Sequence, residues 1–116
     1  MAESGWKVDD SAALYQVKGW GSSFFDINDK GHMVAIPDGK NPVDLKKLYD
    51  ELTARDLYAP LLLRFSDILR ERMGQIHSRF MIAREEAEYQ GQYFGVYPIK
   101  VNQQRQVVEE IVERSE

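Results

Sequence analysis

Two short, almost wholly apolar segments, each followed by a helical pattern, limit this chain to an α/β architecture. Residues 60–65 (Pro-Leu-Leu-Leu-Arg-Phe) begin with a proline and are otherwise almost wholly apolar, which predicts a strand that is covered on both faces. Residues 92–99 are rich in aromatic and β-branched side chains, which favour a second buried strand. Because strands of this kind occur in parallel sheets flanked by helices, the two segments are expected to be parallel.

Three helices are predicted around these strands. The first begins at an Asn41 N-cap with Pro42 in its first turn, and it buries a stripe of leucines. The second covers about 67–89, repeats apolar residues with spacings of 4, 3, 4, 3 and 4, and is ended by Gly91. The third follows an N-cap at Asn102 and runs to about Arg114. The stripes are Leu45, Leu48 and Leu52 in the first helix and Leu69, Met73, Ile76, Phe80, Ala83 and Ala87 in the second.

A β-hairpin is predicted ahead of this helix-strand-helix-strand-helix unit. Residues 23–27 and 32–36 alternate in the manner of strands. Between them lie residues 28–31 (Asn-Asp-Lys-Gly), all of which tolerate the positive φ of a tight turn. Residues 15–17 are a candidate third strand, so a small antiparallel element is expected.

The chain therefore divides into three predicted parts. Residues 1–14 are expected to form a flexible lead-in, residues 15–38 the β element, and residues 39–116 the α/β unit. Two parallel strands leave unpaired edges, and three helices cannot cover both sheet faces. The last helix also reaches Glu116 without a glycine or proline stop signal. We expect the unit to be incomplete on its own and the chain to be the front portion of a larger protein.

Composition excludes several classes of function. A formal charge of -4, with lysine and arginine scattered along the chain, disfavours a nucleic-acid partner. No apolar run approaches the roughly 18 residues that span a bilayer, so a cytoplasmic protein without membrane attachment is expected. The chain has no cysteine, so a nucleophile must be another residue type. No metal site is predicted, because neither His32 nor His77 has a second histidine at ligand spacing.

Lys100 is the candidate catalytic residue. It ends the second apolar segment, in the turn before a helix, where α/β sheets carry ligands. An amine attacks a carbonyl group only when it is unprotonated, and apolar surroundings favour that form. Strand alternation places Lys100 on one face with Phe94, Val96 and Pro98, so it is expected at the top of a packed interior. The alternative is a solvated lysine at a strand end without chemistry.

Three segments carry a resemblance to a known family. They are residues 20–28 with Gly31, residues 60–69, and residues 96–103 (Val-Tyr-Pro-Ile-Lys-Val-Asn-Gln), of which the last is the most specific. Together they resemble the amino-terminal portion of the biosynthetic arginine decarboxylases, pyridoxal-phosphate enzymes of the alanine-racemase-like fold. The resemblance implies the start of a (β/α)8 TIM-type barrel, a hairpin that joins a separate β-domain, and an imine between Lys100 and pyridoxal phosphate.

The resemblance also implies a function. The full-length protein is expected to convert L-arginine into agmatine and carbon dioxide for polyamine (spermidine) biosynthesis, as a homo-oligomer with pyridoxal phosphate and magnesium. Proteins of the family are several times longer, so this chain alone is expected to be inactive. Two alternatives stay open: another enzyme of the same fold, such as a diaminopimelate or ornithine decarboxylase or an alanine racemase, and a non-catalytic α/β module.

The same resemblance predicts a poorly packed hairpin. If its β-domain is completed by a distant part of the protein, the hairpin lacks its natural cover here. We therefore expect Phe24, Phe25, Val34 and Ile36 to be exposed.

Overall fold

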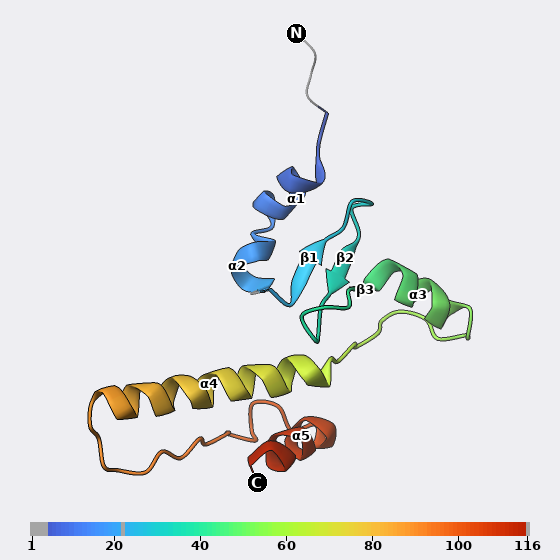
Figure 1. Cartoon of the computed structure of the whole chain (residues 1–116). Helices are drawn as coiled ribbons and strands as arrows, with labels where there is room; N and C mark the ends of the chain where they lie inside the picture. The colour runs from blue at the N-terminus through green and yellow to red at the C-terminus, as the bar shows by residue number, and fades with distance from the viewer. Residues whose placement is uncertain (1–4, 22, 116) are drawn as a thin grey trace. The chain divides into compact units, whose positions relative to one another are not determined.

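The computed structural model describes residues 5–21 and 23–115, which divide after Arg64 into two compact units (Figure 1). The first unit holds helices α1 (Val8–Leu14), α2 (Val17–Gly21) and α3 (Leu45–Thr53) with a small sheet. The second unit holds helices α4 (Ser66–Glu86) and α5 (Arg105–Ser115). The mixed α/β class predicted from the sequence is confirmed, and each unit is described by itself.

The predicted hairpin is confirmed in the first unit. Strands β1 (Phe25–Ile27) and β2 (Met33–Ala35) pair antiparallel, with Asp26 opposite Val34. Asn28 shapes the turn between them, because its Oδ1 atom accepts hydrogen bonds from the main-chain N–H groups of Lys30 and His32, both at 3.0 Å. Gly31 adopts a φ of 76°, the left-handed conformation that glycine reaches without strain.

The third strand lies elsewhere than predicted. Residues 15–17 are not a strand: they form the bend between α1 and α2 and the first residue of α2. Their main-chain N–H groups are bonded locally, Tyr15 to Ser11 and Gln16 to Ala13, which removes them from pairing with a sheet. The third strand is β3 (Val43–Asp44), which pairs antiparallel with β2. Helix α1 also occupies much of the expected lead-in, whose residues 1–4 lie outside the described residues.

A small core fixes the hairpin against the helices of the first unit. Val17 and Ala35 are fully buried, and Phe24 and Val34 are each 6% exposed. The prediction that Phe24 and Val34 would be exposed is wrong, while Phe25 and Ile36 are half-buried. The reason is that α2 packs on β1 and supplies the cover that was expected from a distant segment.

Helix α3 begins later than predicted. Asn41 is not its N-cap, because Asn41 belongs to the preceding turn, where Asp38 Oδ1 accepts the N–H groups of Lys40 and Asn41. The N-cap is Asp44, the last residue of β3, whose Oδ1 accepts the N–H groups of Lys46 and Lys47. The predicted leucine stripe of this helix is half-buried.

Helices α4 and α5 make up the second unit. Helix α4 confirms the predicted long helix, although it ends at Glu86, ahead of Gly91. Arg70 joins it to α5 with two hydrogen bonds to one carboxylate: Nε lies 2.6 Å from Glu110 Oε2, and Nη2 lies 2.9 Å from Oε1. The apolar stripe of α4 remains partly open, with Ile76 and Phe80 more than half exposed. None of the described helices has both the length and the apolar character that crossing a membrane requires.

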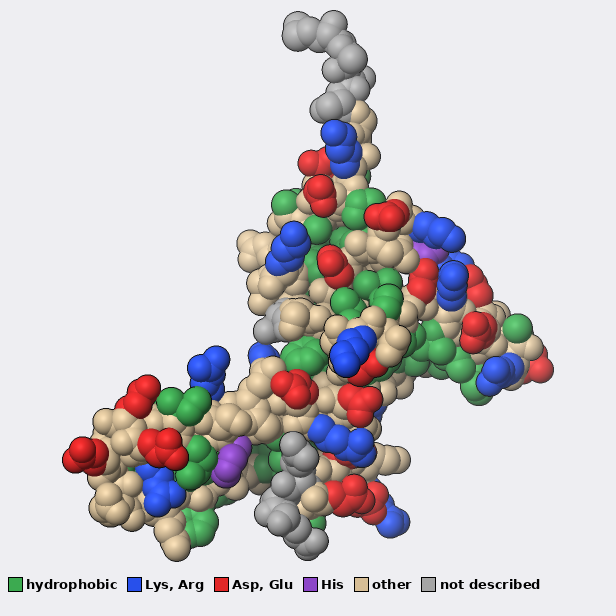
Figure 2. Space-filling model, viewed as in Figure 1, with side chains coloured by type: hydrophobic (Ala, Val, Ile, Leu, Met, Phe, Trp, Pro, Cys, Tyr) green, Lys and Arg blue, Asp and Glu red, His purple; other side chains and the backbone are tan. Residues whose placement is uncertain are grey.

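The two predicted parallel strands are not formed. Residues 61–65 and 92–98 are without regular secondary structure, and in the described part of the chain the sheet consists of β1, β2 and β3. A strand is stable only when its main-chain groups pair with a neighbouring strand, and within the described residues neither segment is part of a sheet. Their apolar side chains remain open, with Leu62 69% and Val96 86% exposed, and many apolar side chains are visible at the surface in Figure 2.

Candidate functional site

Lys100 lies in a tight turn between the segment of residues 92–98 and helix α5. The turn is closed by the main-chain N–H of Val101, which donates to the carbonyl oxygen of Pro98 at 3.1 Å. Lys100 is exposed within it. The position expected from the sequence, just before a helix, is therefore retained, although the preceding segment is not paired as a strand.

A second hydrogen bond spans the same turn. The phenol hydroxyl of Tyr97 donates to the main-chain carbonyl oxygen of Asn102 at 3.2 Å. Tyr97 and Asn102 are both half-buried, whereas residues 98–101 between them are exposed. Tyr97 was not predicted from the sequence as a residue of the site, because its ring is also typical of a strand. A hydroxyl group three residues before the lysine is the one feature of the sequence that could have indicated a hydrogen bond across the turn.

Asn102 shapes the approach to α5 without capping it. Its Oδ1 atom accepts the N–H of Gln104 at 3.1 Å, and α5 begins at Arg105. The prediction that Asn102 is the helix N-cap is therefore wrong. The side chain stabilises a turn that precedes the helix, which is another common role of asparagine.

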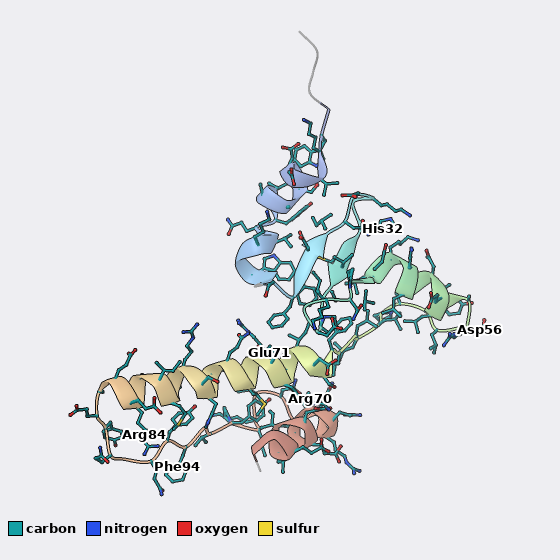
Figure 3. All side chains as sticks on the ribbon, viewed as in Figure 1. His32, Asp56, Arg70, Glu71, Arg84 and Phe94 are labelled. Atoms are coloured by element: carbon teal, nitrogen blue, oxygen red, sulfur yellow. The ribbon has the colours of Figure 1, made fainter. Side chains whose placement is uncertain are left out.

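The start of the lysine-bearing segment is held by aromatic packing. The ring of Tyr93 stacks on Phe80 of α4, with centroids 4.6 Å apart and planes inclined by 15°. The same ring lies 5.8 Å from the ring of His77. Phe94, labelled in Figure 3, is 74% exposed instead. The adjacent side chains of Tyr93 and Phe94 thus differ sharply in their contacts.

The apolar surroundings predicted for Lys100 are not present. Phe94 and Val96, expected to share its face, are 74% and 86% exposed, because no partner strand covers them. Within the described residues Lys100 has no ion-pair partner. Its amine is accordingly open to solvent in this chain.

These residues fit one part of pyridoxal phosphate binding. An exposed primary amine on a defined turn suits covalent attachment to an aldehyde. A phosphate group needs N–H donors or positive charge, but the N–H groups of Val101 and Gln104 beside the lysine are already bonded. In the part of the chain that the structure describes, no three side chains gather as metal ligands would. The turn thus presents an amine that could react with an aldehyde, while the N–H groups of Val101 and Gln104 do not provide free donors for a phosphate.

A polar cluster in the first unit is structural in character. Asp44 Oδ2 lies 3.0 Å from His32 Nδ1 and accepts a hydrogen bond of 3.0 Å from Asn28 Nδ2. Figure 3 labels His32 beside the amino-terminal end of α3. The hydrogen bond from His32, followed by that from the N–H of Lys47, lowers the pKa of the Asp44 carboxyl from 3.8 to about 2. The cluster ties the hairpin turn to the start of α3.

An open hollow of about 430 Å³ lies at the carboxyl end of α4. Arg84 and Tyr89 are among its lining residues, and Arg84 Nε donates to the Tyr89 carbonyl oxygen at 3.2 Å. Glu85 and Glu88 also line it. Lys100 is not among its lining residues.

No family model matches the chain. A biosynthetic arginine decarboxylase of Gloeobacter violaceus is 50% identical over 110 residues, which is 93% of this chain. A biosynthetic arginine decarboxylase of Phocaeicola vulgatus is 54% identical over 109 residues, and one of Nostoc sp. is 44% identical over 109 residues, each covering 92% of this chain.

The chain resembles a segment of the biosynthetic arginine decarboxylases. The match spans 17% of the length of the Gloeobacter violaceus arginine decarboxylase and 17% of that of Phocaeicola vulgatus. It leaves out only a few residues of this chain, so it includes residues 96–103 and with them Lys100. The resemblance to arginine decarboxylases that the three segments indicated is thereby confirmed.

Proposed function

We propose that the protein containing this chain is a pyridoxal-phosphate-dependent arginine decarboxylase, which converts L-arginine into agmatine and carbon dioxide for polyamine biosynthesis. The observation that carries the proposal is the match to biosynthetic arginine decarboxylases at about half identity across nearly the whole chain, including the segment around Lys100. Because the chain spans 17% of these relatives, the activity is assigned to the longer protein. This chain, taken as its amino-terminal part, is expected to be inactive alone.

Lys100 has a definite task in this proposal. Pyridoxal phosphate supplies an aldehyde that binds amines and a ring that accepts the electrons left when carbon dioxide departs. The Nζ atom of Lys100 would hold the cofactor, and the turn from Pro98 to Val101 fixes the main chain from which that amine extends. The amine must be unprotonated to react. The longer protein is therefore expected to cover Phe94 and Val96 and to exclude water from the surroundings of the lysine.

The same proposal includes the barrel. We infer that residues 60–65 and 92–99 become neighbouring parallel strands once the longer protein supplies their partners. Support comes from their exposed apolar side chains, because exposed apolar patches in a protein usually mark surfaces that a partner covers. The β element of residues 15–38, which contains the hairpin, is proposed to join a separate β-domain. A cytoplasmic homo-oligomer that uses magnesium is also part of the proposal, and no residue of this chain is assigned to the metal.

The test uses the full-length protein, purified with pyridoxal phosphate and reduced with borohydride. Peptide mapping by mass spectrometry is expected to find the pyridoxyl group on Lys100, and Lys100→Arg is expected to abolish it. Lys40→Arg, at an exposed lysine of the first unit, is the matched control and should leave labelling unchanged. A folded protein with unmodified Lys100 overturns the proposal.

Substrate identity is decided by a second measurement. Carbon dioxide release is compared for L-arginine, L-ornithine and diaminopimelate, and racemisation is followed with L-alanine. The proposal requires release from arginine with agmatine as product. Labelled Lys100 together with turnover of one of the other substrates would assign the protein to a different activity of the same fold.

A further inference from the structure

We infer that Tyr97 is a positioning residue for Lys100, because its hydroxyl group closes the turn from which the lysine extends. The inference rests on the proposed function, which gives the geometry of this turn a chemical use. The Tyr97 hydroxyl is bonded to a main-chain carbonyl oxygen and is not assigned to a reacting atom. It acts through the main chain that carries Lys100.

Two nested hydrogen bonds define the turn. The inner bond joins the N–H of Val101 to the carbonyl oxygen of Pro98 at 3.1 Å. The outer bond joins the Tyr97 hydroxyl to the carbonyl oxygen of Asn102 at 3.2 Å. Lys100 lies inside both closures. The outer bond is the one made by a side chain, so it is the one that a substitution removes.

The burial pattern shows why the outer bond matters. Between Phe94 and Val101 every residue except Tyr97 is exposed, and Asn102 is the next half-buried residue. The bond thus connects the two half-buried residues of this stretch. The bond restrains the main chain between Tyr97 and Asn102, where Lys100 lies.

A reactive lysine depends on such constraints. Its amine stands at the end of a flexible four-carbon stem, so the position of its Cα atom sets the region that the amine can reach. A displacement of about 1 Å at a reacting group costs about a hundredfold in rate in unfavourable cases. Removing the hydroxyl is therefore expected to slow capture of the cofactor and turnover while leaving arginine binding nearly intact.

The hydrogen bond from Tyr97 can be removed by a single substitution that changes nothing else in the turn. Tyr97→Phe deletes the donor and keeps the ring, and the acceptor is a main-chain carbonyl that no side-chain change removes. Tyr93→Phe is the matched control, since it makes the same chemical change in the same segment. Tyr93 is placed by ring contacts with Phe80 and His77, which phenylalanine retains.

The experiment uses the full-length protein loaded with pyridoxal phosphate. For Tyr97→Phe we expect kcat to fall by about fivefold or more, the rate equivalent of one ordinary hydrogen bond, with KM for arginine changed by less than about twofold. When pyridoxal phosphate is added to the cofactor-free protein, the borohydride-trapped label on Lys100 should appear more slowly than in the wild type. Amide hydrogen exchange at Val101 should be faster by a similar factor. Tyr93→Phe should match the wild type in all four measurements.

The outcomes separate the two proposals. Failure of Lys100 to label in the wild type overturns the proposed function. Labelling in the wild type, with Tyr97→Phe equal to Tyr93→Phe in kcat, labelling rate and Val101 exchange, overturns the positioning role alone. If Tyr97→Phe does not fold, the wild type decides: a Val101 amide protected at least about tenfold over an unstructured peptide supports the closed turn, and an unprotected amide overturns it.

Discussion

The Nδ1 atom of His32 lies 3.0 Å from the Oδ2 atom of Asp44 and joins the hairpin turn to the first turn of α3. Asn28 donates to the same oxygen, while the other oxygen of Asp44 accepts the N–H groups of Lys46 and Lys47. The Asp44 side chain is only 13% exposed. One carboxylate therefore satisfies donors from two elements that are far apart in sequence.

The first prediction concerns acid. The pKa of Asp44 falls from 3.8 to about 2 on folding, caused first by the hydrogen bond with His32. Because the folded pKa lies below the unfolded value, the carboxylate stabilises the fold fully above about pH 4, and this stabilisation is lost as the pH falls toward 2. The free energy of unfolding should fall in that pH range. It is measured by urea unfolding of the chain, followed by the fluorescence of Trp6 and Trp20.

Asp44→Asn isolates the effect, because asparagine is also a good N-cap but carries no charge. The variant should be less stable near neutral pH and should lose less of its stability between pH 4 and pH 2 than the wild type. Asp29→Asn, at an exposed residue of the hairpin turn, is the control and should leave the acid dependence unchanged. Equal acid dependence of Asp44→Asn and wild type would contradict the prediction.

The second prediction concerns the hairpin turn. Asn28→Ala removes two hydrogen bonds to main-chain N–H groups and one to Asp44. The free energy of unfolding should fall by about 2 kcal/mol, less than the sum of three separate bonds because water partly replaces them. Urea unfolding with tryptophan fluorescence measures it. Asp29→Ala is the control, and a loss as large in that variant would show that the effect is not specific to Asn28.

The third prediction concerns the small core. Val17 is fully buried where α2 meets the sheet, so Val17→Ala removes two buried methyl groups and leaves a cavity. The free energy of unfolding should fall by about 2 kcal/mol. Leu14→Ala, at a residue 63% exposed, should change it by less than about 0.5 kcal/mol. Similar losses in the two variants would mean that α2 does not cover the sheet in solution.

The fourth prediction compares two lengths of the protein. Val96 is 86% exposed in this chain, so Val96→Ala should change its free energy of unfolding by less than about 0.5 kcal/mol. In the full-length protein the proposed barrel buries this side chain, and the same substitution should cost about 2 kcal/mol. Urea unfolding of both lengths gives the difference. A negligible effect in the longer protein would contradict the barrel.

Features set by neighbours in sequence were predictable. The hairpin followed from the turn at residues 28–31, and α4 from its apolar spacing over several turns. Features that need distant partners were not. Residues 60–65 and 92–99 have the composition of strands, but composition does not supply the neighbouring strand that the main chain must pair with. The burial of Phe24 was mispredicted for the converse reason, because its cover comes from the nearby α2.

Helix starts were the least predictable feature. Asn41 and Asn102 are both good N-caps by residue type, yet each takes part in a turn that precedes the helix. Aspartate or asparagine side chains serve either role with the same atoms, so local sequence does not separate the two. The same limit applies at the candidate site. The location of Lys100 in a turn before a helix was predictable, whereas the bond from Tyr97 across that turn could be identified only in the three-dimensional structure.

Asp44 is at once the last residue of β3 and the N-cap of α3. The strand therefore passes directly into the helix, and no linker separates them. The rotation of α3 about its axis is fixed relative to the sheet at this one residue. One residue inserted between Val43 and Leu45 would rotate the helix by about 100° relative to the sheet and turn its half-buried leucines toward water.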